Sequence, residues 1–282
     1  MRRGLDTVSD FGHRKPGLLP TVIWRLATHK MIGQQQRKVI RKRFARRFQG
    51  PFDVEAEGVR MRAYPFENYC DRTVVGRKAL PEIPERRLIA PMIKPGMVFV
   101  DIGANVGSYS MFVAKACGDH ARILAFEPHP RTFSKLVFNL EANGFRSVEA
   151  INRGTGPKSQ RLKLYSSGGT NIGTASLHSD AIVARDHVEI KITRLSEALV
   201  LRNIDRVDLL KIDVEGYEDQ ALLPLMIPEY RSLWPKAVLI ETVLRRLWKI
   251  DCVEHLESLG YRIAGATSEN TLLTLSADDR EA

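Results

Sequence analysis

Two acidic residues end two consecutive apolar runs, and glycines follow the first of them. Asp101 closes a run that begins at Met97 and is followed by Gly103 and Gly107; Glu127 closes the next run, 26 residues after Asp101. Both runs have the length and composition of buried strands. Ligands bind at the carboxyl ends of strands in an open α/β sheet, and glycines let the backbone approach a ligand closely. The spacing therefore predicts a ligand-binding edge that carries both acids.

The spacing of the glycines excludes two common phosphate-binding loops. A dinucleotide fingerprint would need glycine where Asn105 and Ser108 stand, and a Walker A loop would need Gly-Lys-Ser/Thr. An acid at the strand end repels a pyrophosphate and attracts a cation. S-adenosylmethionine carries a sulfonium and an ammonium group, and Glu127 can accept hydrogen bonds from both hydroxyls of an unphosphorylated ribose. Asp101 could instead cap a helix and Glu127 could be a solvated strand end, but the two acids together favour S-adenosylmethionine as cofactor.

A second charged group ends a later strand, at Lys211-Ile-Asp213-Val-Glu215-Gly216. Substrate chemistry is expected there, beside the cofactor strand. We predict Asp213 and Glu215 as catalytic residues, with Glu215 as base or substrate ligand and Asp213 bordering the methionine end of the cofactor. Both side chains point the same way if the strand is still extended, whereas a tight turn at Gly216 would separate their roles. The alternative for Lys211 is a strand-end salt bridge with one of the acids.

Three further residues are candidates for the base. Glu241 ends the next strand, and His178 and His187 lie in an irregular insert. Strand-end acids also invite a metal hypothesis, because hard divalent ions take oxygen ligands. No Asp- or Asn-rich ligand loop accompanies the acids, so no metal site is predicted.

The elements that carry these residues alternate between strands and helices from about residue 91 onward. This pattern, with an antiparallel pair at the end, predicts a doubly wound, mostly parallel α/β sheet with a reversed edge strand. An extra hairpin and a loop are expected between residues 153 and 194. The predicted strands are 97–101, 122–127, 148–152, 207–213, 237–241, 261–264 and 271–275, and the predicted helices are 106–116, 132–143 and 252–259.

Three ordered segments of the chain resemble the FkbM-type methyltransferases. They are Phe99–Ser110 (FVDIGANVGSYS), Ala125–Pro130 (AFEPHP) and Leu210–Glu218 (LKIDVEGYE), and the resemblance covers about residues 60 to 275. It implies a class I methyltransferase (Rossmann-like) sheet, S-adenosylmethionine as cofactor, and O-methylation of a sugar, lipid or polyketide. The cofactor-binding residues expected by position are Asp101, Gly103, Asn105, Gly107 and Glu127, with Pro128 stiffening the turn that follows.

The positive charge of the chain lies in its first 50 residues. They hold 13 Lys and Arg against two Asp and Glu, whereas the remaining 232 residues hold 30 against 31. The net charge of +10 is therefore weak evidence for a nucleic-acid partner. We expect three parts: a basic helical N-terminal extension (1–50), a lead-in (51–90) and an S-adenosylmethionine-binding domain (91–282).

One basic helix is expected within the extension. Residues 37–48 place Ile40, Phe44 and Phe48 on one helical stripe among cations. Such a helix can lie on an anionic membrane surface; we favour the alternative, in which the stripe packs onto the catalytic domain. No apolar run approaches the ~18 residues that span a bilayer, and three widely spaced cysteines suit free thiols. The expected location is the cytoplasm, with peripheral attachment to the inner face of a membrane as the alternative.

These features together favour a methyltransferase that acts on a hydroxyl of a sugar, glycolipid or polyketide-like small molecule. Such an enzyme must align donor and acceptor, exclude water and deprotonate the alcohol. Two rivals stay open: an RNA methyltransferase that uses the basic arm, and a non-catalytic binding module on the same fold. An Asn-Pro-Pro-Tyr-type loop is absent and the cations are confined to one segment, which argues against RNA.

Overall fold

The computed structural model describes residues 4–28, 31–166, 176–177 and 186–276. Within these residues a central sheet has seven strands in the order β11-β12-β10-β9-β3-β4-β5. Strands β5, β4, β3, β9 and β10 pair in parallel, as the alternating pattern predicted. Their bounds are β3 Val98–Ile102, β4 Arg122–Phe126, β5 Val148–Ile151, β9 Leu209–Ile212, β10 Ala237–Glu241, β11 Tyr261–Ala266 and β12 Asn270–Leu275.

The reversed strand is β12, which lies one position in from the edge. The sequence predicted the reversed strand at the edge itself. Helix α9 (Cys252–Ser258) carries the chain from β10 to β11, two positions away in the sheet. Strand β12 returns through residues 267–269 and fills the gap, because it pairs antiparallel with both β10 and β11.

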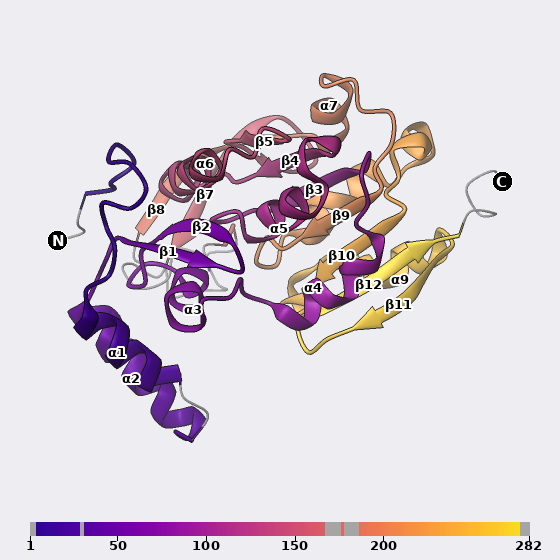
Figure 1. Cartoon of the computed structure of the whole chain (residues 1–282). Coiled ribbons are helices and arrows are strands. Elements are labelled where there is room, and N and C mark those ends of the chain that lie inside the picture. Colours follow the sequence, from indigo (N-terminus) through magenta and orange to yellow (C-terminus); the bar gives the residue numbers. More distant parts are fainter. Residues whose placement is uncertain (1–3, 29–30, 167–175, 178–185, 277–282) are drawn as a thin grey trace.

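Helices cover both faces of the sheet (Figure 1). Alternation along β3 sends Val98, Val100 and Ile102 to one face, while Phe99 and Asp101 point to the other. The first face is covered by α7 (Leu195–Val200), α8 (Glu218–Leu222) and α9, and the second by α4 (Ile83–Ile89), α5 (Ser108–Cys117) and α6 (Pro130–Asn143). This division decides which side chains can reach the carboxyl edge of the sheet.

The irregular region after β5 contains a second, three-stranded sheet in the order β6-β8-β7. Its strands are β6 (Gly154–Thr155), β7 (Gln160–Ser166) and β8 (Asp186–Thr193). Strands β7 and β8 pair antiparallel, so the predicted hairpin is confirmed. One apolar face of the hairpin is buried and carries Leu164, Ile190 and Ile192.

The N-terminal region adds a hairpin, β1 (Phe52–Ala56) and β2 (Val59–Ala63), followed by α3 (Tyr69–Arg77). Two further helices, α1 (Leu18–Thr28) and α2 (Gln34–Arg47), pack on each other, and α1 contacts α3. Phe44 of the predicted basic stripe is buried against Trp24 of α1, with ring centroids 4.4 Å apart. The stripe is therefore packed, with α1 as a partner that the sequence did not predict. No helix among the described residues is long and apolar enough to cross a bilayer.

Candidate active site

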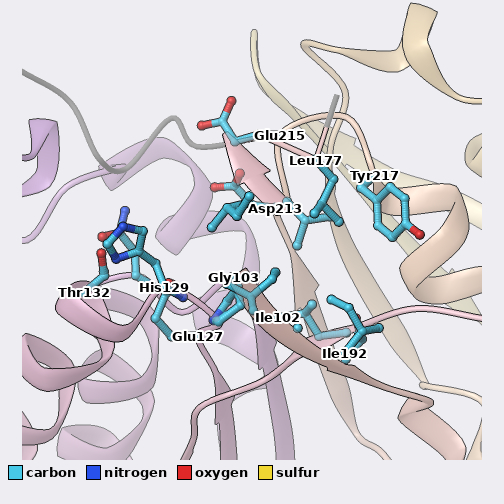
Figure 2. Close-up of a pocket in the computed structure, with 17 residues that line it drawn as sticks. Ile102, Gly103, Glu127, His129, Thr132, Leu177, Ile192, Asp213, Glu215 and Tyr217 are labelled. Atoms are coloured by element: carbon cyan, nitrogen blue, oxygen red, sulfur yellow. Dashed lines mark hydrogen bonds between the residues drawn. The ribbon is translucent and has the colours of Figure 1, made fainter. Parts of the chain in front are cut away.

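The carboxyl ends of β3, β4 and β9 meet at one cavity (Figure 2). The edge of the large sheet lines it with polar groups, and the three-stranded insert lines it with apolar ones. The polar side is formed by Asn105, Glu127, His129, Thr132, Asp213 and Glu215. The apolar side is formed by Leu164, Leu177, Ile190 and Ile192 of the insert, together with Tyr217 at the start of α8. The structure thus brings both predicted groups of acids into one compartment.

The glycines after β3 are required by close packing. Gly103 and Gly107 have φ angles of +78° and +93°, a region that disfavours side chains. A methyl group on Gly103 would overlap the carbonyl oxygen of Asp213, and one on Gly107 would overlap the side chain of Leu136. Gly103 lines the cavity, whereas Gly107, also predicted as a cofactor residue, does not. The first glycine therefore lets the loops after β3 and β9 touch.

Asp101 is fully buried and does not line the cavity. Its Oδ2 accepts hydrogen bonds from the backbone N–H of Ser110 (3.1 Å) and from the Ser110 hydroxyl (2.6 Å), in α5. Its Oδ1 has no hydrogen-bond partner among the described residues. Burial raises the pKa of Asp101, and the nearby charge of Lys211 opposes the rise. The contacts shown are those of a residue that fixes the helix behind the loop.

Glu127 stands where a ribose-binding acid is expected. Its two carboxylate oxygens accept one backbone N–H each, from Asn105 at 2.9 Å and from His129 at 2.8 Å. Burial raises the pKa of Glu127 to about 7, and these backbone donors limit the rise. A carboxylate oxygen has two lone pairs, so each oxygen retains an acceptor position. Pro128 and Asn105, both predicted at this site, also line the cavity.

The loop after β9 makes the tight turn that the sequence left open. Strand β9 ends at Ile212, and Glu215 and Gly216 both have positive φ angles, +56° and +95°. The carboxyl group of Glu218 holds this turn, because it accepts hydrogen bonds from the backbone N–H groups of Val214 (2.9 Å) and Gly216 (3.2 Å). Figure 2 shows the carboxyl groups of Asp213 and Glu215 on the same side of the loop.

Glu218 is a residue whose role the sequence did not reveal. It is buried and its second oxygen accepts a hydrogen bond from the indole N–H of Trp248 at 2.5 Å. The motif Asp-Val-Glu-Gly-Tyr-Glu contains it, yet spacing alone does not distinguish a structural acid from a catalytic one.

The apolar wall of the cavity was also not predicted from the sequence. Its signal was the alternation of apolar and charged residues in 162–164 and 188–190, which is typical of a half-buried hairpin.

Lys211 forms the strand-end ion pair that was the alternative to a catalytic role. Its Nζ lies 3.1 Å from Oδ2 of Asp213 and 5.0 Å from the ring centroid of Tyr109. Lys211 is also the neighbour of Asp101 in the sheet register. Burial lowers the pKa of Lys211, but the charges of Asp213 and Asp101 raise it by more, so the pKa lies above the ordinary value of lysine. Asp213 therefore has one oxygen near a buried cation while it lines the cavity.

The candidates for the base differ in position and protonation. Burial, together with Asp213 and Glu218, raises the pKa of Glu215 to about 8. Burial and the same group of acids raise the pKa of Glu241 to about 10, and Glu241 does not line the cavity. His187 is exposed and also does not line it, and His178 lies outside the described residues. Glu215 is therefore the candidate that combines access with a pKa near neutrality.

A family model described as the methyltransferase FkbM domain matches residues 101–262, which is more than half of the chain. The chain belongs to the FkbM methyltransferase family. Methyltransferases of this family depend on S-adenosylmethionine. The family resemblance of the three sequence segments is thereby confirmed.

Curated relatives share about a quarter to a third of the aligned residues. Methyltransferase 1 of Beauveria bassiana is 32% identical over 141 residues, 44% of this FkbM-family chain and 56% of that protein. The 31-O-demethyl-FK506 methyltransferase FkbM of Streptomyces tacrolimicus is 28% identical, over 46% and 60%. The hexuronic acid methyltransferase AglP of Haloferax volcanii is 26% identical, over 48% and 53%. The chain thus spans less than two thirds of the length of these relatives.

Solved structures of methyltransferases also align with this FkbM-family chain. The precorrin-6y C5,15-methyltransferase of Geobacter metallireducens aligns with a TM-score of 0.41 and 16% identity, covering 70% of this chain and 90% of that one.

The hydrogen-bonding and apolar groups in the cavity of the FkbM-family chain fit S-adenosylmethionine. Glu127 retains acceptor positions for two ribose hydroxyls. The hydroxyl of Thr155, which also lines the cavity, is buried without a hydrogen-bond partner among the described residues and can bond a ring nitrogen. The apolar side chains of Ile190 and Ile192 form a wall that suits the face of an adenine. We propose these residues as the binding site for the adenosine half of the cofactor.

Proposed function

We propose that the protein transfers the methyl group of S-adenosylmethionine to a hydroxyl oxygen of a carbohydrate or polyketide-like acceptor. The observation that carries this proposal is that Glu127 and Glu215 line the same cavity. An acid suited to ribose and a carboxyl group with a pKa near neutrality therefore share one compartment. Two relatives support the acceptor class: one is named for a 31-O-demethyl substrate and another for a hexuronic acid.

The proposed reaction is a direct displacement. Bound S-adenosylmethionine supplies an electrophilic methyl group on its sulfonium. The acceptor oxygen bonds to the methyl carbon as the carbon–sulfur bond breaks, the acceptor proton passes to a base, and the products are a methyl ether and S-adenosylhomocysteine. Glu127 binds the ribose, Asp213 borders the methionine end, and the apolar wall excludes water from the reacting atoms.

Glu215 is the proposed base. A general base is most effective when its pKa lies near the working pH, and the pKa of Glu215 is raised to about 8. Glu241, with a pKa raised to about 10, holds its proton at neutral pH and cannot take up the proton of the acceptor. The left-handed backbone at Glu215 costs free energy and is held by Glu218, as expected of a residue positioned for function.

The test is an acceptor screen with the full chain. S-adenosylhomocysteine release would be measured with S-adenosylmethionine and a panel of hexuronic acids, oligosaccharides and macrolides that carry free hydroxyls. We expect release that depends on the acceptor and methyl ethers in the product by mass spectrometry. Loss of a methyl group from glycans or lipids of a deletion strain would identify the natural acceptor. Release with RNA alone, or cofactor binding without turnover on any acceptor, would contradict the proposal.

A further inference from the structure

Helix α1 exposes an apolar stripe that its packing does not explain. Leu18, Leu19, Val22 and Leu26 are 87%, 62%, 53% and 57% exposed, and their spacing places them on one face of the helix. Trp24, on the opposite side of this helix, is 1% exposed and packs against Phe44 of α2. Scattered exposed leucines are ordinary on a surface, but a continuous helical stripe indicates a contact that forms elsewhere.

The partner helix α2 is strongly cationic. Seven of the eleven residues from Arg37 to Arg47 are Lys or Arg, and none is acidic. At 100° per residue these cations are distributed around the helix, and the sector without them is the one that holds Ile40 and Phe44. Any face that α2 presents away from Trp24 therefore presents positive charge.

The pair of helices extends from the body of the protein. Figure 1 shows α1 and α2 side by side, beyond α3 and away from the central sheet. An apolar stripe and a cationic helix on one projecting unit are the two components of an interfacial membrane contact: apolar side chains enter the acyl boundary, and cations lie at the headgroups. A nucleic acid would use the cations and leave the leucines in water.

We propose that the two-helix unit α1–α2 docks on an anionic lipid bilayer, with Leu18, Leu19, Val22 and Leu26 inserted at the interface and the positive charge of α2 attracting the anionic headgroups. The element that inserts is thus α1, whereas the stripe of α2 that the sequence singled out is already packed against Trp24. Each cation near an anionic surface adds to the attraction, and each buried leucine adds apolar area. The proposal does not depend on the identity of the methyl acceptor.

The test is sedimentation of the full chain with vesicles of phosphatidylcholine, with and without 30 mol% phosphatidylglycerol as a roughly physiological anionic fraction. We expect strong binding to the anionic vesicles that weakens with salt, and weak binding to the neutral ones. The variant Leu19→Gln/Val22→Gln/Leu26→Gln keeps helix formers and should bind at least about tenfold more weakly. The variant Arg43→Gln/Arg46→Gln/Arg47→Gln should lose about 100-fold on anionic vesicles only, since each cation contributes roughly 1 kcal/mol there.

Matched controls separate the unit from general stickiness. Val200 and Leu201 are exposed at the end of α7, and Arg87, Lys249 and Arg262 are exposed outside the unit. Their Gln variants should bind vesicles as the wild type does. Equal binding by the leucine variant and the wild type would overturn the proposal. A concentration-dependent dimer that the leucine variant abolishes would also overturn it, because the stripe would then be an interface between copies. Binding to single-stranded RNA without vesicle binding would overturn it too, because the arginines would then serve a nucleic acid.

Discussion

At the scale of single residues, burial decides what each carboxyl group at the sheet edge can do. Glu127, Glu215 and Glu241 have the same side chain, yet their pKa values are raised to about 7, 8 and 10. Glu127 has backbone donors that favour the ionised form, whereas Glu215 and Glu241 share a neighbourhood of other acids. Glu127 therefore suits ribose binding, Glu215 suits proton transfer, and the protonated Glu241 suits hydrogen-bond donation.

Replacing Glu127 with Ala should weaken binding of S-adenosylmethionine by about 1.5–3 kcal/mol, the range for hydrogen bonds to a charged group. Because the ionised carboxylate accepts both ribose hydroxyls, binding favours the deprotonated form of Glu127. The dissociation constant of the wild type should therefore rise as pH falls below about 7, by up to about tenfold per unit. Calorimetry from pH 5.5 to 8.5 measures both effects, with exposed Glu229→Ala as the control. Wild-type affinity in the Glu127 variant would remove the ribose assignment.

Replacing Glu215 with Gln should keep the shape of the side chain and lower kcat by ~10²–10⁴-fold, the usual contribution of a general base. Only the ionised form accepts a proton, so the kcat of the wild type should rise with pH and level off above about 8. The variant should lose this rise and retain cofactor affinity. Steady-state kinetics on the acceptor found in the screen would show both. Turnover within a few-fold of wild type would instead favour alignment and desolvation without a base.

At the scale of elements, the loops after β3 and β9 form one unit. Gly103 lies against the carbonyl group of Asp213, and Glu218 holds the next residues from the start of α8. The insert is attached to the same turn, because the Ser176 hydroxyl donates to the carbonyl oxygen of Glu215 at 2.7 Å. The two halves of the cavity are therefore held together by the close backbone contact at Gly103 and by hydrogen bonds from the Glu218 and Ser176 side chains to the backbone of the turn.

The substitution Gly103→Ala should disturb both loops. Gly96 provides a matched control, because its φ of +80° is close to the +78° of Gly103 and a methyl group there meets nothing within 4 Å. Gly96→Ala should cost about 1–2 kcal/mol of unfolding free energy from left-handed backbone strain. Gly103→Ala should cost about 1–3 kcal/mol more from overpacking, and should reduce both cofactor affinity and turnover. Denaturant unfolding and calorimetry compare the pair; equal costs in the two variants would show that the loops can move apart freely.

At the scale of the whole molecule, the first 50 residues divide into two parts. Residues before α1 bind the β1–β2 hairpin: the guanidinium of Arg62, itself paired with Asp53, donates to the carbonyl oxygens of Ser9 (2.7 Å) and Asp10 (2.9 Å). Arg62 is 1% exposed. The helices α1 and α2 lie outside this network, so we propose that the separable unit is 18–47 and not the whole of 1–50.

Two deletions test this division. Replacing residues 18–47 with a short Gly-Ser linker should leave cofactor affinity unchanged and remove vesicle binding. Deleting residues 1–50 should in addition lower the unfolding free energy by about 1–3 kcal/mol, because Arg62 loses charged hydrogen bonds. Thermal and denaturant unfolding, with calorimetry for the cofactor, would compare the two proteins. Loss of cofactor binding in the shorter deletion would place α1–α2 within the catalytic body.

The sequence by itself determined the strand ends, the glycine loop and the class of cofactor. These follow from apolar runs and from Asp101, Gly103 and Glu127 at their ends, and such signals arise between residues close along the chain. The parallel order of the strands followed from their alternation with helices. The resemblance to a known family pointed to the same edge of the sheet.

Only the tertiary structure decided how the acids divide their work. Asp101 proved to be hydrogen-bonded to Ser110 of α5, and the pKa of Glu215 depends on burial and on the charges of Asp213 and Glu218. It also decided that Trp24 covers Phe44 and leaves the stripe of α1 exposed. The acids that act on Glu215 are close to it along the chain, but burial comes from segments far apart in the chain, so no local pattern records it.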